Sequence, residues 1–366
     1  NRTTRFGGNK YNFKFMNIQI SKNKEVFNFS TPYIIAEIGA NHNGDMDLAK
    51  KMIDSAVECG CDAVKFQSWT PKSLIAKEEY ERNQSYDDSP KKHFGSLEEM
   101  VTKYYLRPEQ HFELKEYCEG KGVDFCSSPF STKEVDLLME IGVPFLKIAS
   151  MDINNLPFLK YAARTMKPIV VSTGMATLAE IDTAVQTIRG EGNEQIVLLH
   201  CISIYPPKDE DIHLRNITML QEAFHLPVGF SDHSFGTAVP LASVALGACI
   251  IEKHFTLDKD LPGWDHEISA DPAEMKAICD DSKKIQAAMG NVHRTVSADE
   301  EAKKDKFRRS IVAATDLKKG TVLSEEHFDY KRPGTGIPPN EYTYVAGRKL
   351  KEDISADTLL TWKHFE

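Results

Sequence analysis

Two histidines occupy equivalent positions in successive apolar segments. "VGFSDH" (228–233) ends on His233, and "CIIEKHF" (249–255) carries His254. A single histidine more often makes a structural hydrogen bond. Two at the ends of neighbouring strands can bind one divalent metal, with water completing its shell. Such a metal would polarise a carbonyl group, and the adjacent Glu252 could orient a ligand or act as a general base. The pair therefore predicts a divalent metal site.

Lysines lie at or near the ends of three such segments, at Lys65, Lys147 and Lys253. A buried lysine is costly unless it is paired. Ammonium and hydroxyl donors together suit a phosphate and a carboxylate, and the hydroxyls would come from Ser127, Ser150, Ser172 and Ser231. We therefore expect an anion pocket. The competing use is a Schiff-base lysine of an aldolase, which the histidine pair disfavours because a metal and an imine perform the same task.

Eight short segments rich in Val and Ile must position these side chains: 33–39, 63–67, 123–129, 145–150, 169–174, 196–201, 228–233 and 249–255. Continuous apolar runs of this length are typical of parallel strands buried on both faces. Segments of helical period separate them, at 46–60, 108–122, 177–190 and 271–290. The alternation predicts an α/β (β/α)8 TIM barrel, whose active site lies at the carboxyl ends of the strands. An open doubly wound sheet is the alternative, disfavoured by the count of eight and by the lack of a strand-linked GxGxxG.

Polar residues follow these strands at their carboxyl ends: Glu37, Lys65, Gln67, Ser127, Lys147, Ser150, Ser172, His200, Ser203, Tyr205, Ser231, Asp232, His233, Glu252, Lys253 and His254. Any one of them could be a solvated strand end. Their recurrence in register predicts that they line one site. The polar segment Thr70–Arg107 is long for a loop, and we expect a lid over the site or a surface excursion.

Composition narrows the function further. The apolar fraction of 41% and charged fraction of 27% are ordinary for a globular protein. No apolar run reaches the about 18 residues of a membrane helix. Seven scattered cysteines, an odd number without a CxxC pair, predict reduced thiols and a cytoplasmic location. A net charge of −9 argues against nucleic-acid binding. Residues 1–16 lack a signal-peptide core, and we expect a tag or a disordered segment there.

The sequence pattern changes after the barrel segments, which we predict to form a domain of residues 17–290. Residues 291–306 are polar and read as a linker to a small domain, 307–366. Within it "DLKKGTVLSEEHF" (316–328) and "DISADTLLTWKHF" (353–365) align without gaps. Coincidence is one explanation; the physical one is a domain with two quasi-equivalent halves. About 60 residues bury little core alone, so we expect it to pack on another surface.

The motifs "AEIGANHNGDMDLAKKMI", "AVKFQ", "STGMAT", "LLHC", "YPP", "GFSDHS", "EKHFTLDKDLPGWDH" and "KRPGTGI" resemble those of the sialic acid, or nonulosonate, synthase family. The resemblance runs from about Tyr33 to the end. It implies a TIM barrel followed by an antifreeze-like (SAF) domain. It also implies a transferase that condenses phosphoenolpyruvate with an open-chain N-acetylated hexosamine and releases phosphate. Family members are homodimers in which each SAF domain caps the partner's barrel.

The resemblance also implies individual roles. Mn²⁺ or Mg²⁺ would be held by His233 and His254, and the catalytic carboxylate would be Glu37. Phosphoenolpyruvate contacts fall on Lys65, Lys147, Ser150, Ser172, Ser203 and Ser231, although many members have Asn where this chain has Ser203. Sugar contacts fall on Gln67, Tyr205, Asp265 and the partner-donated Arg332.

Two departures from the family pattern concern the sugar. Trp264 stands in "GWDH" where many members have Gly-Pro-Asp, and Asp152 stands where many have Glu. N-acetylmannosamine and a 2,4-diacetamido-trideoxyhexose both remain open as acceptors. Two other functions also remain: a metal-dependent aldolase that uses pyruvate, and a non-catalytic carbohydrate-binding scaffold.

Overall fold

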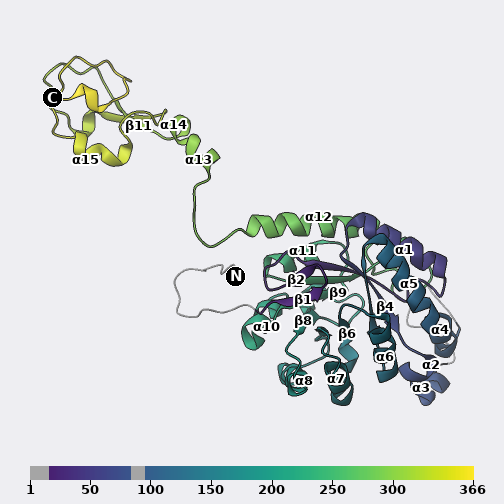
Figure 1. Ribbon diagram of the computed structural model, residues 1–366. Helices are drawn as coiled ribbons and strands as arrows, with labels where there is room; N and C mark the ends of the chain where they lie inside the picture. Colours follow the sequence, from purple (N-terminus) through teal and green to yellow (C-terminus); the bar gives the residue numbers. More distant parts are fainter. Residues whose placement is uncertain (1–15, 84–94) are drawn as a thin grey trace. The chain divides into compact units, whose positions relative to one another are not determined.

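The computed structural model describes residues 16–83 and 95–366, which form two compact units divided between Gly290 and Asn291 (Figure 1). The prediction of a tag or disorder at residues 1–16 lies outside the described residues except at Met16.

Eight parallel strands form one sheet that nearly closes into a barrel, in the order β5-β4-β3-β10-β9-β8-β7-β6, with β5 and β6 side by side. Their bounds are β3 Tyr33–Gly39, β4 Ala63–Ser68, β5 Asp124–Pro129, β6 Leu146–Ile148, β7 Ile169–Ser172, β8 Ile196–Cys201, β9 Val228–Asp232 and β10 Ile250–His254. The predicted TIM barrel is confirmed, and the doubly wound alternative is wrong.

Helices surround the strands (Figure 1). The principal ones are α1 Met46–Cys59, α5 Pro108–Lys121, α6 Thr132–Ile141, α7 Leu156–Ala163, α8 Leu178–Gly190, α10 Asn216–Phe224, α11 Ala238–Ala245 and α12 Pro272–Met289, with the single turn α9 Asp209–Ile212 after β8. The four predicted helices are confirmed as α1, α5, α8 and α12. Thr177 and Glu180 form the expected capping box of α8.

A hairpin that the sequence analysis missed precedes the barrel. Strands β1 (Ile18–Ser21) and β2 (Lys24–Val26) pair antiparallel. Its buried Ile18, Ile20 and Val26 belong to one apolar cluster with Tyr33 and Val197 from the starts of barrel strands. The hairpin therefore packs on the amino-terminal end of the barrel, opposite the expected site.

The long segment between β4 and α5 carries three short helices: α2 Pro71–Leu74, α3 Lys77–Arg82 and α4 Leu97–Lys103. Its buried apolar side chains pack around Trp69, whose indole nitrogen donates to the Val101 carbonyl at 3.1 Å. We use the name aromatic cluster for four rings of this region: Trp69, Tyr104, Phe130 and Trp264. Residues 84–94, part of the predicted lid, lie outside the described residues.

The carboxyl-terminal unit begins with two short helices, α13 Ala298–Ala302 and α14 Lys304–Phe307, in the segment predicted as a linker. Strands β11 (Ser310–Ala313) and β12 (Phe328–Lys331) then pair antiparallel, and α15 (Tyr342–Val345) follows.

The predicted equivalence of two halves within this unit is confirmed. Leu317 and Ile354, which correspond in the sequence alignment, exchange reciprocal backbone hydrogen bonds of 2.7 and 2.8 Å. Each half ends in a 3-10 turn, Glu325–His327 and Trp362–His364, and the same type of histidine cap closes both. The corresponding apolar side chains are buried in pairs: Leu317 and Ile354, Leu323 and Leu360, Phe328 and Phe365.

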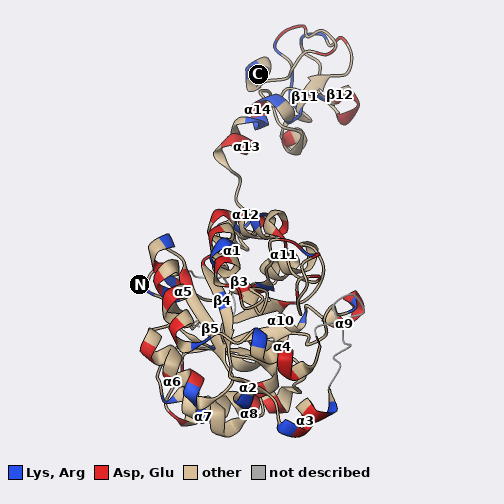
Figure 2. Ribbon diagram, turned by 90° about the vertical axis from the view of Figure 1, so that its right-hand side faces the viewer, with Lys and Arg blue, Asp and Glu red and all other residues tan. Residues whose placement is uncertain are grey.

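Acidic and basic residues lie together on the outer helices of the barrel unit, while the strands are largely uncharged (Figure 2). Among residues 16–83 and 95–366, no helix has the length and apolar character that a membrane span requires.

We predict that Gly229→Ala destabilises the barrel by about 1–3 kcal/mol, because overpacking strains a close-packed interior. A Cβ there would lie 2.6 Å from the Ile250 carbonyl oxygen and 2.6 Å from a Leu199 methyl. The matched control is Gly120→Ala in α5, where a Cβ meets nothing within 4 Å, and which should stabilise by about 0.4–1 kcal/mol. Urea unfolding measures both, and equal stability of Gly229→Ala and wild type would contradict this packing.

Candidate active site

A cavity of about 470 Å³ opens at the carboxyl ends of the barrel strands. Twelve of the thirteen predicted site residues line it: Glu37, Lys65, Gln67, Lys147, Ser150, Ser172, Ser203, Tyr205, Ser231, His233, His254 and Asp265. They come from every strand of the barrel except β5, either from the strand itself or from the residues just after it. The thirteenth, Arg332, belongs to the other unit.

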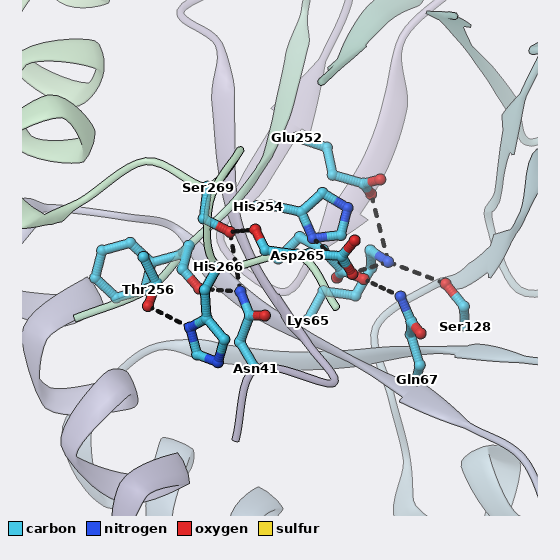
Figure 3. A network of polar contacts seen from close by, with 12 residues as sticks. Asn41, Lys65, Gln67, Ser128, Glu252, His254, Thr256, Asp265, His266 and Ser269 are labelled. Carbon is cyan, nitrogen blue, oxygen red and sulfur yellow. Dashed lines mark hydrogen bonds and ion pairs between the residues drawn. The ribbon is translucent and has the colours of Figure 1, made fainter. Parts of the chain in front are cut away.

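Four buried charges meet in this cavity. Lys65 Nζ lies 2.7 Å from a Glu37 oxygen, and Lys147 Nζ lies 3.1 Å from a Glu252 oxygen. A longer contact of 3.9 Å from Lys65 to Glu252 joins the two pairs (Figure 3). We call these four residues the charge cluster. Two ammonium groups and two carboxylates balance one another, which offsets the cost of burying each charge.

Neutral side chains complete the charge cluster. Gln67 donates to Glu37 at 2.9 Å, and Ser231 donates to Glu252 at 3.1 Å. Ser172 Oγ is buried and has no hydrogen-bond partner among the described residues. Buried hydroxyls are normally hydrogen-bonded, so Ser172 has a donor available for a ligand.

The two carboxyls of the charge cluster differ in acidity. Burial raises the pKa of Glu37 to about 7, against the opposing attraction of Lys65. Burial also acts on Glu252, but Lys147 and Lys65 outweigh it and hold the pKa of Glu252 below its usual range. Environments that separate the pKa values of neighbouring carboxyls are typical of acid–base sites, and Glu37 can exchange a proton near neutral pH.

The histidine rings lie beside each other, with centroids 5.5 Å apart. His233 Nδ1 is 2.8 Å from the Ile202 carbonyl oxygen, which only accepts, so Nδ1 carries a proton and Nε2 keeps a lone pair in the neutral ring. Burial, reinforced by the neighbouring His233, holds the pKa of His254 well below its usual range. Its buried Nδ1 has no hydrogen-bond partner among the described residues.

Neutral imidazoles with a lone pair directed to solvent or to no partner are the form that binds metals. Asp265 Oδ2 lies 3.8 Å from His254 Nδ1, and the Tyr205 ring covers His233 with centroids 4.0 Å apart. No group of three or more His, Cys, Asp or Glu side chains gathers as a metal shell within the described parts of the chain. The donor set therefore fits a divalent cation held by two imidazoles, with its other positions left for water or substrate.

A polar network holds the loop that carries Asp265 (Figure 3). Asn41 donates to Ser269 Oγ at 2.9 Å, and Ser269 donates to the Asp265 carbonyl at 2.6 Å. The fully buried His266 lies 2.7 Å, through Nδ1, from Thr256 Oγ1. The position of Asp265 is thus set by side chains outside the cavity.

Four predicted strand-end residues do not line the cavity: Lys253, Asp232, His200 and Ser127. Lys253 donates to Asp232 at 2.7 Å and to the Ser234 carbonyl at 2.6 Å, so it is not part of the anion pocket. His200 contacts the Ile212 carbonyl at 2.6 Å. Ser127 is bonded to Ser68. Successive strand residues point to opposite faces, and these four take the face turned away from the cavity.

Two neighbours of these residues, Ser128 and Cys201, face the cavity and were missed by the sequence analysis. Ser128 accepts from Lys65 at 3.0 Å, and Cys201 lines the cavity. Phe130, Met151 and Met175 add apolar wall. Side chains alternate between the two faces of a strand. Once the register of β5 and β8 against their neighbours was known, this alternation would have favoured Ser128 and Cys201.

Arg332 follows β12 directly and is exposed on the carboxyl-terminal unit. Its guanidinium carbon lies 5.3 Å from the centroid of the Phe307 ring, which is a cation–π distance. Arg332 is therefore presented at the surface of its own unit.

Comparison with known proteins gives a family match for each of the two units. The NeuB family matches residues 52–294, and the SAF domain matches residues 308–366. The N,N'-diacetyllegionaminic acid synthase of Legionella pneumophila is 40% identical over 92% of this chain and 95% of its own length. The pseudaminic acid synthase of Campylobacter jejuni is 37% identical over 90% of this chain and 96% of its own length.

A solved structure agrees with this family assignment. The N-acetylneuraminic acid (sialic acid) synthetase of Leptospira borgpetersenii aligns with a TM-score of 0.69 at 34% identity, over 79% of this chain and 95% of that one. Barrel, cavity and sequence thus lead to one conclusion: the chain belongs to the NeuB family of sialic acid and related nonulosonic acid synthases, and it ends in a SAF domain.

Proposed function

We propose that the chain condenses phosphoenolpyruvate with the open-chain aldehyde of an N-acetylated hexosamine, which gives a nine-carbon nonulosonic acid and inorganic phosphate. The charge cluster is the observation that carries the proposal. It combines two buried ammonium groups with a carboxyl of raised pKa, in one cavity with two histidines. The relatives named legionaminic, pseudaminic and sialic acid synthases support the product class.

Phosphoenolpyruvate binds through charge and hydroxyl donors. Lys65 and Lys147 hold its phosphate and carboxylate, and the unpartnered Ser172 hydroxyl donates to one of them. Ser231 and Ser150 line the same cavity, as does Ser203. Charge-assisted hydrogen bonds are about twice as strong as neutral ones, and burial strengthens them further.

The acceptor binds above this anion pocket. His233 and His254 would hold Mn²⁺ or Mg²⁺, which supplies polarisation of the aldehyde oxygen when bound. Gln67, Tyr205 and Asp265, which line the same cavity, orient the sugar hydroxyls. With the aldehyde fixed, its carbon lies open to the methylene carbon of phosphoenolpyruvate.

The chemistry then runs in three bond changes. Carbon 3 of phosphoenolpyruvate bonds to the aldehyde carbon, and positive charge develops at carbon 2. Glu37 stabilises that charge or takes a proton from the water that adds there. The resulting tetrahedral intermediate loses phosphate as its C–O bond breaks, which leaves a keto acid.

The aldolase alternative fits the cavity less well. A Schiff-base lysine must lose its proton before it attacks a carbonyl. Burial lowers the pKa of Lys65, but Glu252 and Glu37 outweigh burial and raise it above the usual value. A non-catalytic scaffold would have no use for a carboxyl with a pKa of about 7 beside two paired lysines.

A second copy of the chain covers the cavity in this proposal. Large apolar side chains around the barrel mouth are more than half exposed: Met151, Met175, Ile204, Tyr205 and Phe235. Exposed apolar groups gathered in one place indicate a contact surface. The partner's SAF domain would bury them and bring Arg332 to the sugar. All seven cysteines are free, which suits a reducing compartment such as the cytoplasm.

Phosphate release from phosphoenolpyruvate, measured against a panel of N-acetylated hexoses, tests the reaction and the anion pocket together. Lys65→Met and Lys147→Met each remove a charge-assisted contact worth about 1.5–3 kcal/mol. The KM for phosphoenolpyruvate should therefore rise by about 10- to 150-fold. Lys160→Met, at an exposed position of α7, is the control. An unchanged KM in both cavity variants would show that the anion pocket is misassigned.

Metal removal gives the next prediction. Chelation should abolish phosphate release, and Mn²⁺ or Mg²⁺ should restore it. His233→Ala should bind no metal in a direct metal assay yet keep its far-UV spectrum, because a residue at the cavity wall adds little to the core. His293→Ala, exposed in the segment after α12, should bind metal as wild type does. Full turnover by metal-free enzyme would refute the metal role.

Arg332 provides a prediction about the partner subunit. Arg332→Ala should raise the KM for the sugar by about 10- to 150-fold and leave phosphoenolpyruvate little affected, since a guanidinium fork matches sugar oxygens. Arg348→Ala, another exposed arginine over an aromatic ring of the same unit, is the matched control.

Mixing Arg332→Ala with Glu37→Gln under subunit exchange should regenerate activity, because one hybrid site then has both residues intact. Heterodimers that form without any rescue would show that the site is built within one chain.

A further inference from the structure

One wall of the cavity is aromatic where the sugar is expected. Trp264 lines the cavity immediately before Asp265 in the chain. Its ring centroid lies 6.2 Å from that of Trp69 and 5.8 Å from that of Tyr104. The aromatic cluster therefore supports Trp264 from behind, and the helices inserted between β4 and α5 contribute to that support.

The Trp264 ring presents carbon rather than nitrogen. Its Nε1 atom is buried, with no hydrogen-bond partner among the described residues, so the part that lines the cavity is the apolar surface of the indole. Phe130, Met151 and Met175 line the same cavity. Together they give the acceptor an apolar wall that suits methyl groups better than hydroxyl groups.

The position of Trp264 is set before any substrate arrives. The polar network through Asn41, Ser269 and His266 holds the loop on one side, and the aromatic cluster holds it on the other. Gly263, just before Trp264, has no room for a side chain, because a Cβ would lie 2.4 Å from the His266 ring. A wall fixed in this way discriminates by shape and polarity rather than by adapting.

The cavity also offers little to a phosphorylated sugar. Among the described residues of the barrel unit that line it, the cations are Lys65 and Lys147, and both belong to the charge cluster. Neither is near Trp264 in the chain, and both are assigned to phosphoenolpyruvate. A sugar phosphate beside the indole would lose its hydration without gaining a charge partner from this wall.

We propose that Trp264 selects the acceptor, and that the preferred acceptor is an unphosphorylated 2,4-diacetamido-2,4,6-trideoxyhexose rather than N-acetylmannosamine. This inference rests on the proposed condensation. The trideoxyhexose carries two acetamido methyls and a C6 methyl, whereas N-acetylmannosamine carries one acetamido methyl and a C6 hydroxymethyl group. In an apolar pocket one such group changes discrimination by about 10- to 200-fold.

The experiment measures kcat/KM at saturating phosphoenolpyruvate for three acceptors: the diacetamido-trideoxyhexose, N-acetylmannosamine and N-acetylmannosamine 6-phosphate. Wild-type dimer should prefer the first by about ten-fold or more. Trp264→Leu should reduce that preference by about ten-fold or more, with the KM for phosphoenolpyruvate within about two-fold of wild type. Trp264→Phe keeps an aromatic face and should retain most of the preference. Phe112→Leu, on the outer face of α5, should change nothing.

Each outcome has a separate meaning. A wild-type preference for N-acetylmannosamine or its phosphate would overturn the substrate class. An unchanged preference in folded Trp264→Leu would overturn the role of the indole; if Trp264→Leu does not fold, Trp264→Gln, which makes this wall polar, replaces it, and an unchanged preference there would overturn the role likewise. No phosphate release by wild type with any acceptor would instead refute the condensation on which the inference rests.

Discussion

The structure depends on burying four charges at the carboxyl end of a nearly closed barrel. Glu37, Lys65, Lys147 and Glu252 come from four different strands and are each at most 5% exposed. A single ion in this position would cost several kcal/mol, so the strands must bring all four together in register. Burial raises the pKa of Glu37 to about 7 against the attraction of Lys65, while Glu252 and Glu37 outweigh burial and raise the pKa of Lys65. Fold and chemistry thus impose the same condition on the sequence.

Sequence patterns predicted the barrel because parallel strands buried on both faces leave continuous apolar runs, and polar residues recur where those runs end. The patterns could not decide which of two adjacent residues, such as Ser127 and Ser128, faces the cavity, because that depends on strand register. Lys253 was misjudged for the same reason: it faces Asp232, away from the cavity. The hairpin β1–β2 escaped notice because three buried side chains in two very short strands produce no periodic signal.

The parts of the cavity have separate tasks in this account. Its charged base binds phosphoenolpyruvate, its histidines hold the metal, and its aromatic wall meets the sugar. The wall depends on the segment between β4 and α5, whose length suggested a lid from sequence and whose described helices pack behind Trp264. The carboxyl-terminal unit has its own apolar core, to which its two similar halves contribute corresponding side chains. Arg332, exposed on this unit, is the residue that we propose to act in a partner chain.

The central claim is that this cavity forms a carbon–carbon bond and then breaks the C–O bond of phosphoenolpyruvate. Phosphoenolpyruvate labelled with ¹⁸O in the bridging oxygen between carbon 2 and phosphorus tests it directly. With acceptor present, the account predicts that the label leaves in inorganic phosphate, seen as an isotope shift in the ³¹P spectrum. Label retained in the sugar acid, or phosphate release that does not require the acceptor, would contradict it.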